Sequence, residues 1–394
     1  MTGLTLASVA DAIRSFPDEF RSRTLTGFFA AEFQARQLFG LHATQAHDGL
    51  PEVIAWALER CGIDGHVPSE VLDRLQRLAL VNRRFGFAPS AYSSYAEAIT
   101  TALKDLAYVH FGEVNILPSQ MFAATLALDT CARYMQRAAQ KADDAGVPAI
   151  HHAAVEDVNR ISSRLSVVRL RCTPELVYEP GQAIYVTAPY LAGLWHSLTP
   201  TTPANLGSSV EFYVDATDGF DAVASLAAAR IDEQWILGGA HASLRLDPAA
   251  TSLTIIAHGT GLAAAHALVF SLVDAARRPQ VHLVATAEYP GELINPPSLR
   301  ALAAHSTWLT LDACVAHDAD AWLVPRPGVA RTTAAEVGAH HGSAVSTLGR
   351  AQLRADQIIV LGAAEKVQAT CEELVGAGVA PERITTRDDD FLAR

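Results

Sequence analysis

Apolar residues recur at three- and four-residue spacing from about residue 4 to residue 140, which is the period of helices that bury one face. Val9, Ile13 and Phe16 form one such stripe, and a long last helix is predicted over residues 121–141. No alternating strand pattern interrupts this stretch. The pattern therefore predicts an all-α domain over residues 1–150.

The pattern changes after residue 150. Residues 142–164 are polar and contain Gly and Pro, so we expect a helix end and a connecting segment there, with His151 and His152 in the connection. Short alternating stretches then follow, separated by turns, at residues 166–171, 183–187, 210–214 and 235–236. Residues 151–250 are therefore predicted to form a linker and an antiparallel β-barrel.

Strands alternate with helices beyond residue 250. A strand over residues 252–257 leads into Gly259, Thr260 and Gly261, and a helix starts at Leu262. Further strands are predicted at residues 281–286, 307–311 and 357–361. This order predicts a doubly wound α/β domain over residues 251–394. A tight connection from strand to helix requires glycine even where no cofactor binds. The glycine turn is therefore stronger evidence for the fold than for a bound cofactor.

Charge and composition narrow the class of partner. The 394 residues carry a net charge of −12, which argues against nucleic acid or an anionic membrane as the main partner. The longest apolar stretch, near residues 262–273, is too short to span a bilayer. The five Cys are scattered without a Cys-x-x-Cys pair, and two adjacent histidines are too few ligands for a metal site. We expect a cytoplasmic protein with reduced thiols, without a signal peptide, membrane insertion or a bound metal.

The segment from Leu80 to Tyr92, with a helix break at Pro89, resembles the globin corner where the helix that carries the haem-binding histidine ends. Residues 178–182, Tyr-Glu-Pro-Gly-Gln, resemble the turn that opens the second strand of ferredoxin-reductase-type FAD domains. Gly259-Thr260-Gly261 resembles the start of the signature of their NAD(P) domains. In this order the three parts resemble the flavohaemoglobin family. The resemblance implies electron transfer from NAD(P)H through FAD to haem, and conversion of nitric oxide to nitrate.

The haem positions of that family fall on unsuitable residues here. The proximal histidine falls at Asn82, the distal Tyr at Leu25 and the distal Gln at Gly49, while Tyr92 is retained. An amide is a weak axial ligand for haem iron, and neither distal residue offers a donor. We therefore expect a globin fold without haem.

The flavin positions are changed as well. The family's Arg-x-Tyr-Ser falls on Leu194, Trp195, His196 and Ser197. Ser197 is retained and His196 is flat enough to stack on a flavin, but Leu194 cannot pair with the pyrophosphate. Loss of that charged hydrogen bond would weaken FAD binding roughly ten- to hundredfold. Alternatively, Trp195 and His196 fill the space that the flavin occupies in the family.

The nicotinamide positions complete the comparison. The family's Cys-Gly pair falls on Leu361 and Gly362, and its final Glu-x-Phe falls on Arg387 and Asp389. The first change removes a thiol, and the second puts a carboxylate where a flavin must accept a hydride. We expect weakened NAD(P) binding.

Three functional hypotheses follow. The first is a non-catalytic flavohaemoglobin-like protein that binds or regulates other proteins. Its Thr385 and Thr386, with Asp residues three positions on, are similar to phosphothreonine sites that forkhead-associated domains accept, which would require a Ser/Thr kinase. The second is a haem-less NAD(P)H-dependent flavin reductase or oxidase. The third is a nitric oxide dioxygenase with an unrecognised haem ligand. The sequence leaves the oligomeric state open.

Overall fold

A computed structural model describes residues 5–39, 47–191, 193–205, 207–216 and 221–387. The chain divides into two compact units. The first contains Met1–Ile150 and also Pro189–Trp195. The second contains His151–Ala188 and His196–Asp389, so it includes both β-sheets. The division predicted near residue 250 within the second unit stays a prediction, and β6 ends at His241 and β7 begins at Ser252 on either side of it.

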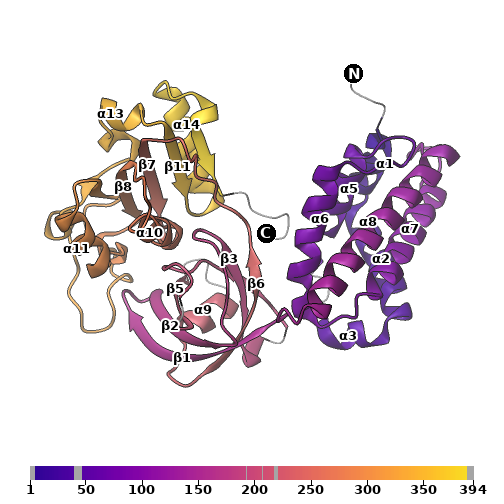
Figure 1. Cartoon of the computed structure of the whole chain (residues 1–394), viewed down its shortest axis with the longest axis horizontal. Helices are drawn as coiled ribbons and strands as arrows, with labels where there is room; N and C mark the ends of the chain where they lie inside the picture. Colours follow the sequence, from indigo (N-terminus) through magenta and orange to yellow (C-terminus); the bar gives the residue numbers. More distant parts are fainter. Residues whose placement is uncertain (1–4, 40–46, 192, 206, 217–220, 388–394) are drawn as a thin grey trace. The chain divides into compact units, whose positions relative to one another are not determined.

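The first unit is helical throughout its regular elements, as the spacing of apolar residues predicted (Figure 1). The first turns of three helices contain Pro17, Pro51 and Pro118. Proline is tolerated there because an N–H in the first turn has no hydrogen-bond partner within the helix. The described helices are α1 (Ala7–Ser15), α2 (Pro17–Ala31), α3 (Phe33–Phe39), α5 (Leu50–Arg60), α6 (Ser69–Asn82), the short η2 (Arg83–Phe85), α7 (Ala91–Val109) and α8 (Pro118–Asp144).

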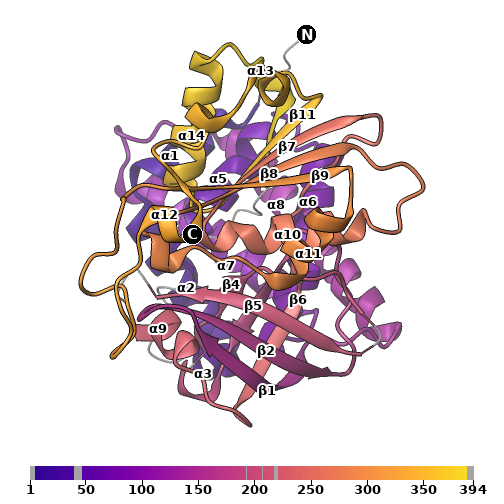
Figure 2. The ribbon, with the colours of Figure 1, turned by 90° about the vertical axis from the view of Figure 1, so that its left-hand side faces the viewer.

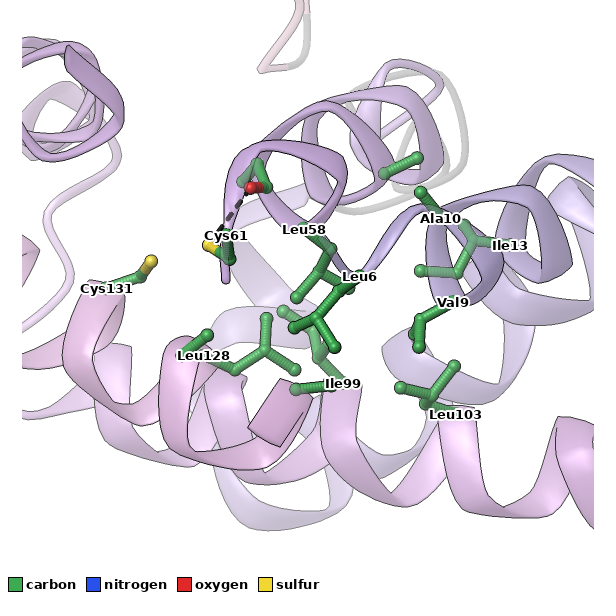
Figure 3. Close-up of a cluster of buried hydrophobic side chains, with 14 of the residues drawn as sticks. Leu6, Val9, Ala10, Ile13, Leu58, Cys61, Ile99, Leu103, Leu128 and Cys131 are labelled. Carbon is green, nitrogen blue, oxygen red and sulfur yellow. Dashed lines mark hydrogen bonds between the residues drawn. The ribbon is translucent and has the colours of Figure 1, made fainter. Parts of the chain in front are cut away.

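The core of the first unit forms where α1, α5, α7 and α8 meet (Figure 3). Leu6, Val9 and Ile13 are fully buried and point toward Leu58 and Leu103. Burying each such side chain stabilises the fold by about 1.5–3 kcal/mol. The same periodicity that predicted the helices therefore also predicted the face of α1 that packs.

The first sheet of the second unit is antiparallel, with strand order β4-β3-β6-β1-β2-β5. Helix α9 (Asp221–Ala227) packs beside β5 and β2. The strands are β1 (His151–Arg160), β2 (Leu165–Thr173), β3 (Ala183–Thr187), β4 (His196–Leu198), β5 (Ser209–Asp215) and β6 (Gln234–His241), with the short η3 (Pro189–Leu191) after β3.

Strand β1 corrects the sequence analysis, which placed His151 and His152 in a connecting segment. His151, Ala153 and Val155 are buried at alternate positions of this strand. The alternation was missed because an imidazole and a small Ala carry two of the inward positions. The His151 ring is hydrogen-bonded through Nδ1 to the carbonyl of Pro174 at 2.9 Å, which allows its burial.

The second sheet is parallel throughout, with strand order β10-β9-β8-β7-β11-β12 (Figure 2). All five residues of β11 are buried, as expected for a strand covered on both faces. The predicted strand at 307–311 begins instead at Leu309. The elements are β7 (Ser252–His258), η4 (Gly259–Gly261), α10 (Leu262–Ser271), β8 (Gln280–Ala287), η5 (Pro290–Glu292), α11 (Pro297–His305), β9 (Leu309–Val315), α12 (Ala334–Val337), β10 (His340–His341), η6 (Val345–Thr347), α13 (Arg350–Leu353), β11 (Gln357–Leu361), α14 (Ala364–Gly376), η7 (Pro381–Arg383) and β12 (Ile384–Thr386).

Candidate functional site

Asn82, at the predicted proximal position, is the last residue of α6. Its Oδ1 accepts a hydrogen bond from Nη1 of Arg84 at 3.2 Å, and the same Nη1 lies 2.9 Å from the carbonyl oxygen of Val81. The Arg84 guanidinium also lies 4.1 Å from the ring centroid of Phe85. The amide is thus part of the polar structure that turns the chain after α6.

Tyr92 connects the two helices of this corner. Its hydroxyl donates to the carbonyl oxygen of Ala79 at 3.3 Å. Burial raises the pKa of the Tyr92 phenol, so the group stays neutral at physiological pH and serves as a donor. The retained tyrosine therefore has a structural role that does not need haem.

The two predicted distal positions do not provide donors. Leu25 lies in α2 with 7% of its surface exposed, and Gly49 lies in the turn before α5 rather than inside that helix. Phe28 contacts Tyr95 and Phe87, with ring centroids 4.7 and 5.9 Å away. An alkyl group, a glycine, an engaged amide and a neutral phenol do not fit the axial and distal demands of haem iron.

The structure separates the residues predicted for the flavin. Trp195 groups with the first unit, where its ring meets that of Phe85 edge-on at 6.4 Å. His196 and Ser197 belong to β4 in the second unit. Burial lowers the pKa of His196, which keeps its ring uncharged near neutral pH.

The hydroxyl of Ser197 is hydrogen-bonded to a buried histidine. Its Oγ lies 3.2 Å from Nε2 of His241, which is 3% exposed and stacks on the ring of Tyr185 at 3.9 Å. Tyr185 lies directly opposite Ser197 in the β3–β4 pair. These contacts fix the direction of the serine hydroxyl.

One cavity of about 460 Å³ in the second unit is lined by seven residues that the sequence analysis names as candidate positions: Ser197, Thr260, Gly261, Leu361, Gly362, Thr386 and Arg387. They come from β4, from the turn after β7, from the end of β11 and from the end of β12. Sequence reasoning missed Thr199, Tyr213 and Cys371, which also line it, because nothing in their local pattern distinguishes them from ordinary strand, loop and helix residues. The remaining lining residues are Leu198, Ala264, Val360, Ala363, Ala364, Val367 and Gln368.

Two glycines form the floor between β7 and β11. A Cβ on Gly261 would lie 2.6 Å from the backbone nitrogen of Gly362. Gly362 has φ +140°, and a Cβ there would lie 2.6 Å from the Cβ of His258. Close packing of backbone on backbone therefore requires both glycines, whether or not a cofactor binds.

The cavity favours a polar or anionic ligand. Helices α10 and α14 begin at its wall, with Gly261 and Ala363 as the residues before their first turns. Helix N-termini carry partial positive charge and present backbone N–H groups. Arg387 adds a guanidinium, whose Nη1 donates to Oγ1 of Thr199 at 2.7 Å. This set fits a phosphate-bearing or carbonyl-rich cofactor better than an apolar one.

The phosphorylation candidates lie in a strand. Thr385 pairs with Ile359 in the β11–β12 ladder, and its Oγ1 accepts a hydrogen bond from Nε2 of Gln357 at 2.8 Å. Thr386 is exposed and reaches the cavity. Asp389, the predicted acidic position beyond it, lies outside the described residues.

Neither a metal centre nor a membrane span is found in the described part of the chain. Within those residues, no group of three or more His, Cys, Asp or Glu could hold a metal ion. The helices described there are also too short or too polar to cross a bilayer.

Comparisons with known proteins identify the architecture. Protein-family models and curated proteins yielded no match. Among solved structures, a flavohemoglobin from Malassezia yamatoensis with bound FAD and heme matches with a TM-score of 0.66 and 16% identity, over 96% of this chain and 98% of that one. A ferredoxin NADP+ reductase from Neisseria gonorrhoeae with bound FAD and NADP matches over 61% of this chain and 98% of its own, at 16% identity. Its TM-score is 0.49. The chain therefore has the flavohaemoglobin-like architecture, in which a globin-like helical domain precedes an FAD-type antiparallel β-domain and an NAD(P)-type α/β domain.

Proposed function

We propose that this chain is a non-catalytic flavohaemoglobin-like protein that acts in the cytoplasm by binding other proteins. The hydrogen bond that Arg84 donates to the amide oxygen of Asn82 supports this most directly, because it engages the side chain at the predicted proximal position, which is already a weak ligand for iron. Leu25 offers no group that could bond to a distal ligand. Without haem, electrons delivered by a reductase would have no iron acceptor in the first unit.

An absorption spectrum with added haemin tests the haem part of the proposal. We expect the wild-type protein to show no ligand-bound Soret band. Asn82→His is the matched control, because it adds an imidazole at the same position and should bind haemin more tightly than wild type. A Soret band of equal strength in both proteins would instead support a nitric oxide dioxygenase with another iron ligand.

A second proposal, an NAD(P)H-dependent flavin reductase without haem, is favoured by the 460 Å³ cavity and its polar lining. Ser197, Thr260 and Arg387 would hold the ligand there. FAD, when bound, accepts a hydride from NAD(P)H. A yellow protein whose flavin band is bleached by NAD(P)H would support this function and contradict the non-catalytic one.

Paired arginine variants distinguish specific flavin binding from adventitious binding. Arg387→Ala removes a guanidinium from the cavity wall, so we expect about tenfold weaker FAD binding if FAD occupies this site. Arg354→Ala is the control, because Arg354 is exposed and does not line the cavity. Equal FAD affinities in the two variants would place any bound FAD elsewhere.

The proposed protein partner is a forkhead-associated domain that recognises phosphorylated Thr386 or Thr385, with a Ser/Thr kinase as the modifying enzyme. Thr386 is the better candidate because it is exposed, whereas the Thr385 hydroxyl is engaged by Gln357. Phosphorylation adds a charge of about −1.5 to −2 that Arg clusters bind. Calorimetry with the phosphorylated chain should show binding that Thr386→Ala abolishes and Thr385→Ala reduces less. Undiminished binding by Thr386→Ala would contradict this assignment.

A further inference from the structure

The corner between α7 and α8 in the first unit exposes six large apolar side chains within nineteen consecutive residues. The three aromatic ones are the most exposed, at 85% for Tyr108, 89% for Phe111 and 72% for Phe122. The two helices pack against each other, with Tyr108 on α7, Phe122 on α8 and Phe111 in the short connection between them. We call this surface the α7–α8 patch, and it consists of Tyr108, Val109, Phe111, Leu117, Phe122 and Leu126.

The patch is separate from the core that α8 helps to build. Leu128 and Cys131 of α8 point into the core (Figure 3), and Ala123 and Ala127 are also buried. Phe122 and Leu126 are four residues apart, so they lie one above the other on the opposite, outward face. The helix is therefore apolar on two sides, and packing within the unit explains only one of them.

The size of the patch matches half of a protein interface. At about 200 Å² per aromatic side chain, the three rings alone leave roughly 500 Å² accessible. The largest apolar patch on a typical monomer is about 300–600 Å², and the three aliphatic side chains extend this one further. Two such patches placed together would bury about 1,200 Å² or more, the lower end of stable interfaces.

The charges around the patch favour a second copy over an anionic surface. Lys104 and Glu113 are exposed beside it, and Asp129 and Arg133 continue the outward face of α8 as an ion pair at 3.0 Å. A twofold interface must be self-complementary, and a rim that contains both signs can pair with its own copy. The net charge of −12 opposes docking on an anionic membrane.

We propose that the α7–α8 patch is the interface of a symmetric homodimer. This inference does not depend on the presence or absence of any cofactor, so its failure would leave the proposed function unaffected. Aromatic side chains at the centre of an interface contribute most of the binding energy. Phe111 and Phe122 are therefore the expected anchors, with the charged residues at the rim.

Sedimentation equilibrium of the full chain across the micromolar range tests the proposal. We expect a dimer for wild type and a monomer for the double variant Phe111→Glu/Phe122→Glu, with an unchanged circular dichroism spectrum. Phe33→Glu is the matched control: Phe33 is 70% exposed in the same unit but lies in α3, and this variant should remain a dimer. A milder single variant, Phe122→Ser, should weaken dimerisation at least about tenfold.

Three results would overturn the proposal. The first is a wild-type protein that stays monomeric at every concentration. The second is a dimer that survives both the double variant and Phe122→Ser. The third is a dimer that Phe33→Glu disrupts as strongly as the double variant does.

Discussion

Residues predicted to carry chemistry are used differently in the two units. In the first unit Leu25 lies in the core, Gly49 lies in a turn, and Asn82 is hydrogen-bonded by Arg84. In the second unit, Gly362 just after β11 and Thr386 at the end of β12 line one cavity together with the glycine turn after β7, although the three segments are far apart in sequence. Parallel strands end at a common edge, which gathers their loops into one site, whereas each helix of a bundle spreads its residues along its length. Similarity in fold to a family therefore does not by itself show that the family's cofactor site is kept.

The largest expected effect concerns the glycines, because it tests whether the cavity floor is fixed by packing. Gly261→Ala would bring a Cβ within 2.6 Å of the backbone of Leu361 and Gly362, which neither residue can avoid by a rotamer change. We expect a loss of about 3 kcal/mol in the free energy of unfolding. Denaturant unfolding of the full chain, with a probe for each unit, measures it.

Gly27→Ala is the matched control in the first unit. Its Cβ would lie 3.4 Å from the Cβ of Ala98, an ordinary contact, inside helix α2. Ala is the better helix former, so this variant should be neutral or more stable by up to about 1 kcal/mol. Equal losses in the two variants would show that the floor of the cavity is no more constrained than a helix crossing.

The next effect is a difference in acid stability between the units. In the second unit His258 bonds to Thr286 and Thr370, and burial lowers its pKa to about 4. Burial also lowers the pKa of His266 to about 4. As the pH falls, the two histidines take up a proton at higher pH in the unfolded chain than in the folded one. The free energy of unfolding therefore falls between about pH 6.5 and about pH 4, by up to about 1.4 kcal/mol per pH unit for each histidine.

The first unit should lose stability only at lower pH. The groups with lowered pKa values there include Glu19 and Glu59. Hydrogen bonds from His110 and Arg23 lower the pKa of Glu19. Hydrogen bonds from Arg14 and Arg60 lower the pKa of Glu59. Their contribution is present above about pH 4.5 and is lost below it. Hydrogen exchange at decreasing pH should show the second unit opening first, with a smaller effect in His258→Asn. Simultaneous opening of both units, unchanged by that variant, would contradict this.

The smallest effect concerns the corner of the first unit. Tyr92→Phe removes a hydroxyl whose hydrogen bond to Ala79 is long, at 3.3 Å. We expect a cost of roughly 1 kcal/mol or less, without any change in the spectrum of protein mixed with haemin. Thermal unfolding and the same spectra check it. A spectral change specific to this variant would mean that Tyr92 does face a haem.

Several features were predictable because they depend on local periodicity. The residues of β3 and β11 were predicted to their ends, and the glycine turn after β7 was placed correctly. Strand β1 was not predicted, since His151 is buried only because Pro174 supplies a hydrogen-bond acceptor from another segment. The placement of Trp195 beside Phe85 likewise depends on contacts across more than a hundred residues.

The sequence by itself determined the order of helical, antiparallel and parallel parts, because hydrophobic period and turn residues act over a few positions. It also supported a prediction of which residue types stand at the family's haem, flavin and nicotinamide positions. Only the tertiary structure decided what those residues contact: Arg84 for Asn82, His241 for Ser197, and Thr199 for Arg387. Hydrogen bonds and cavities depend on distances between segments that the linear pattern does not contain, and for that reason the cavity emerged only from the folded chain.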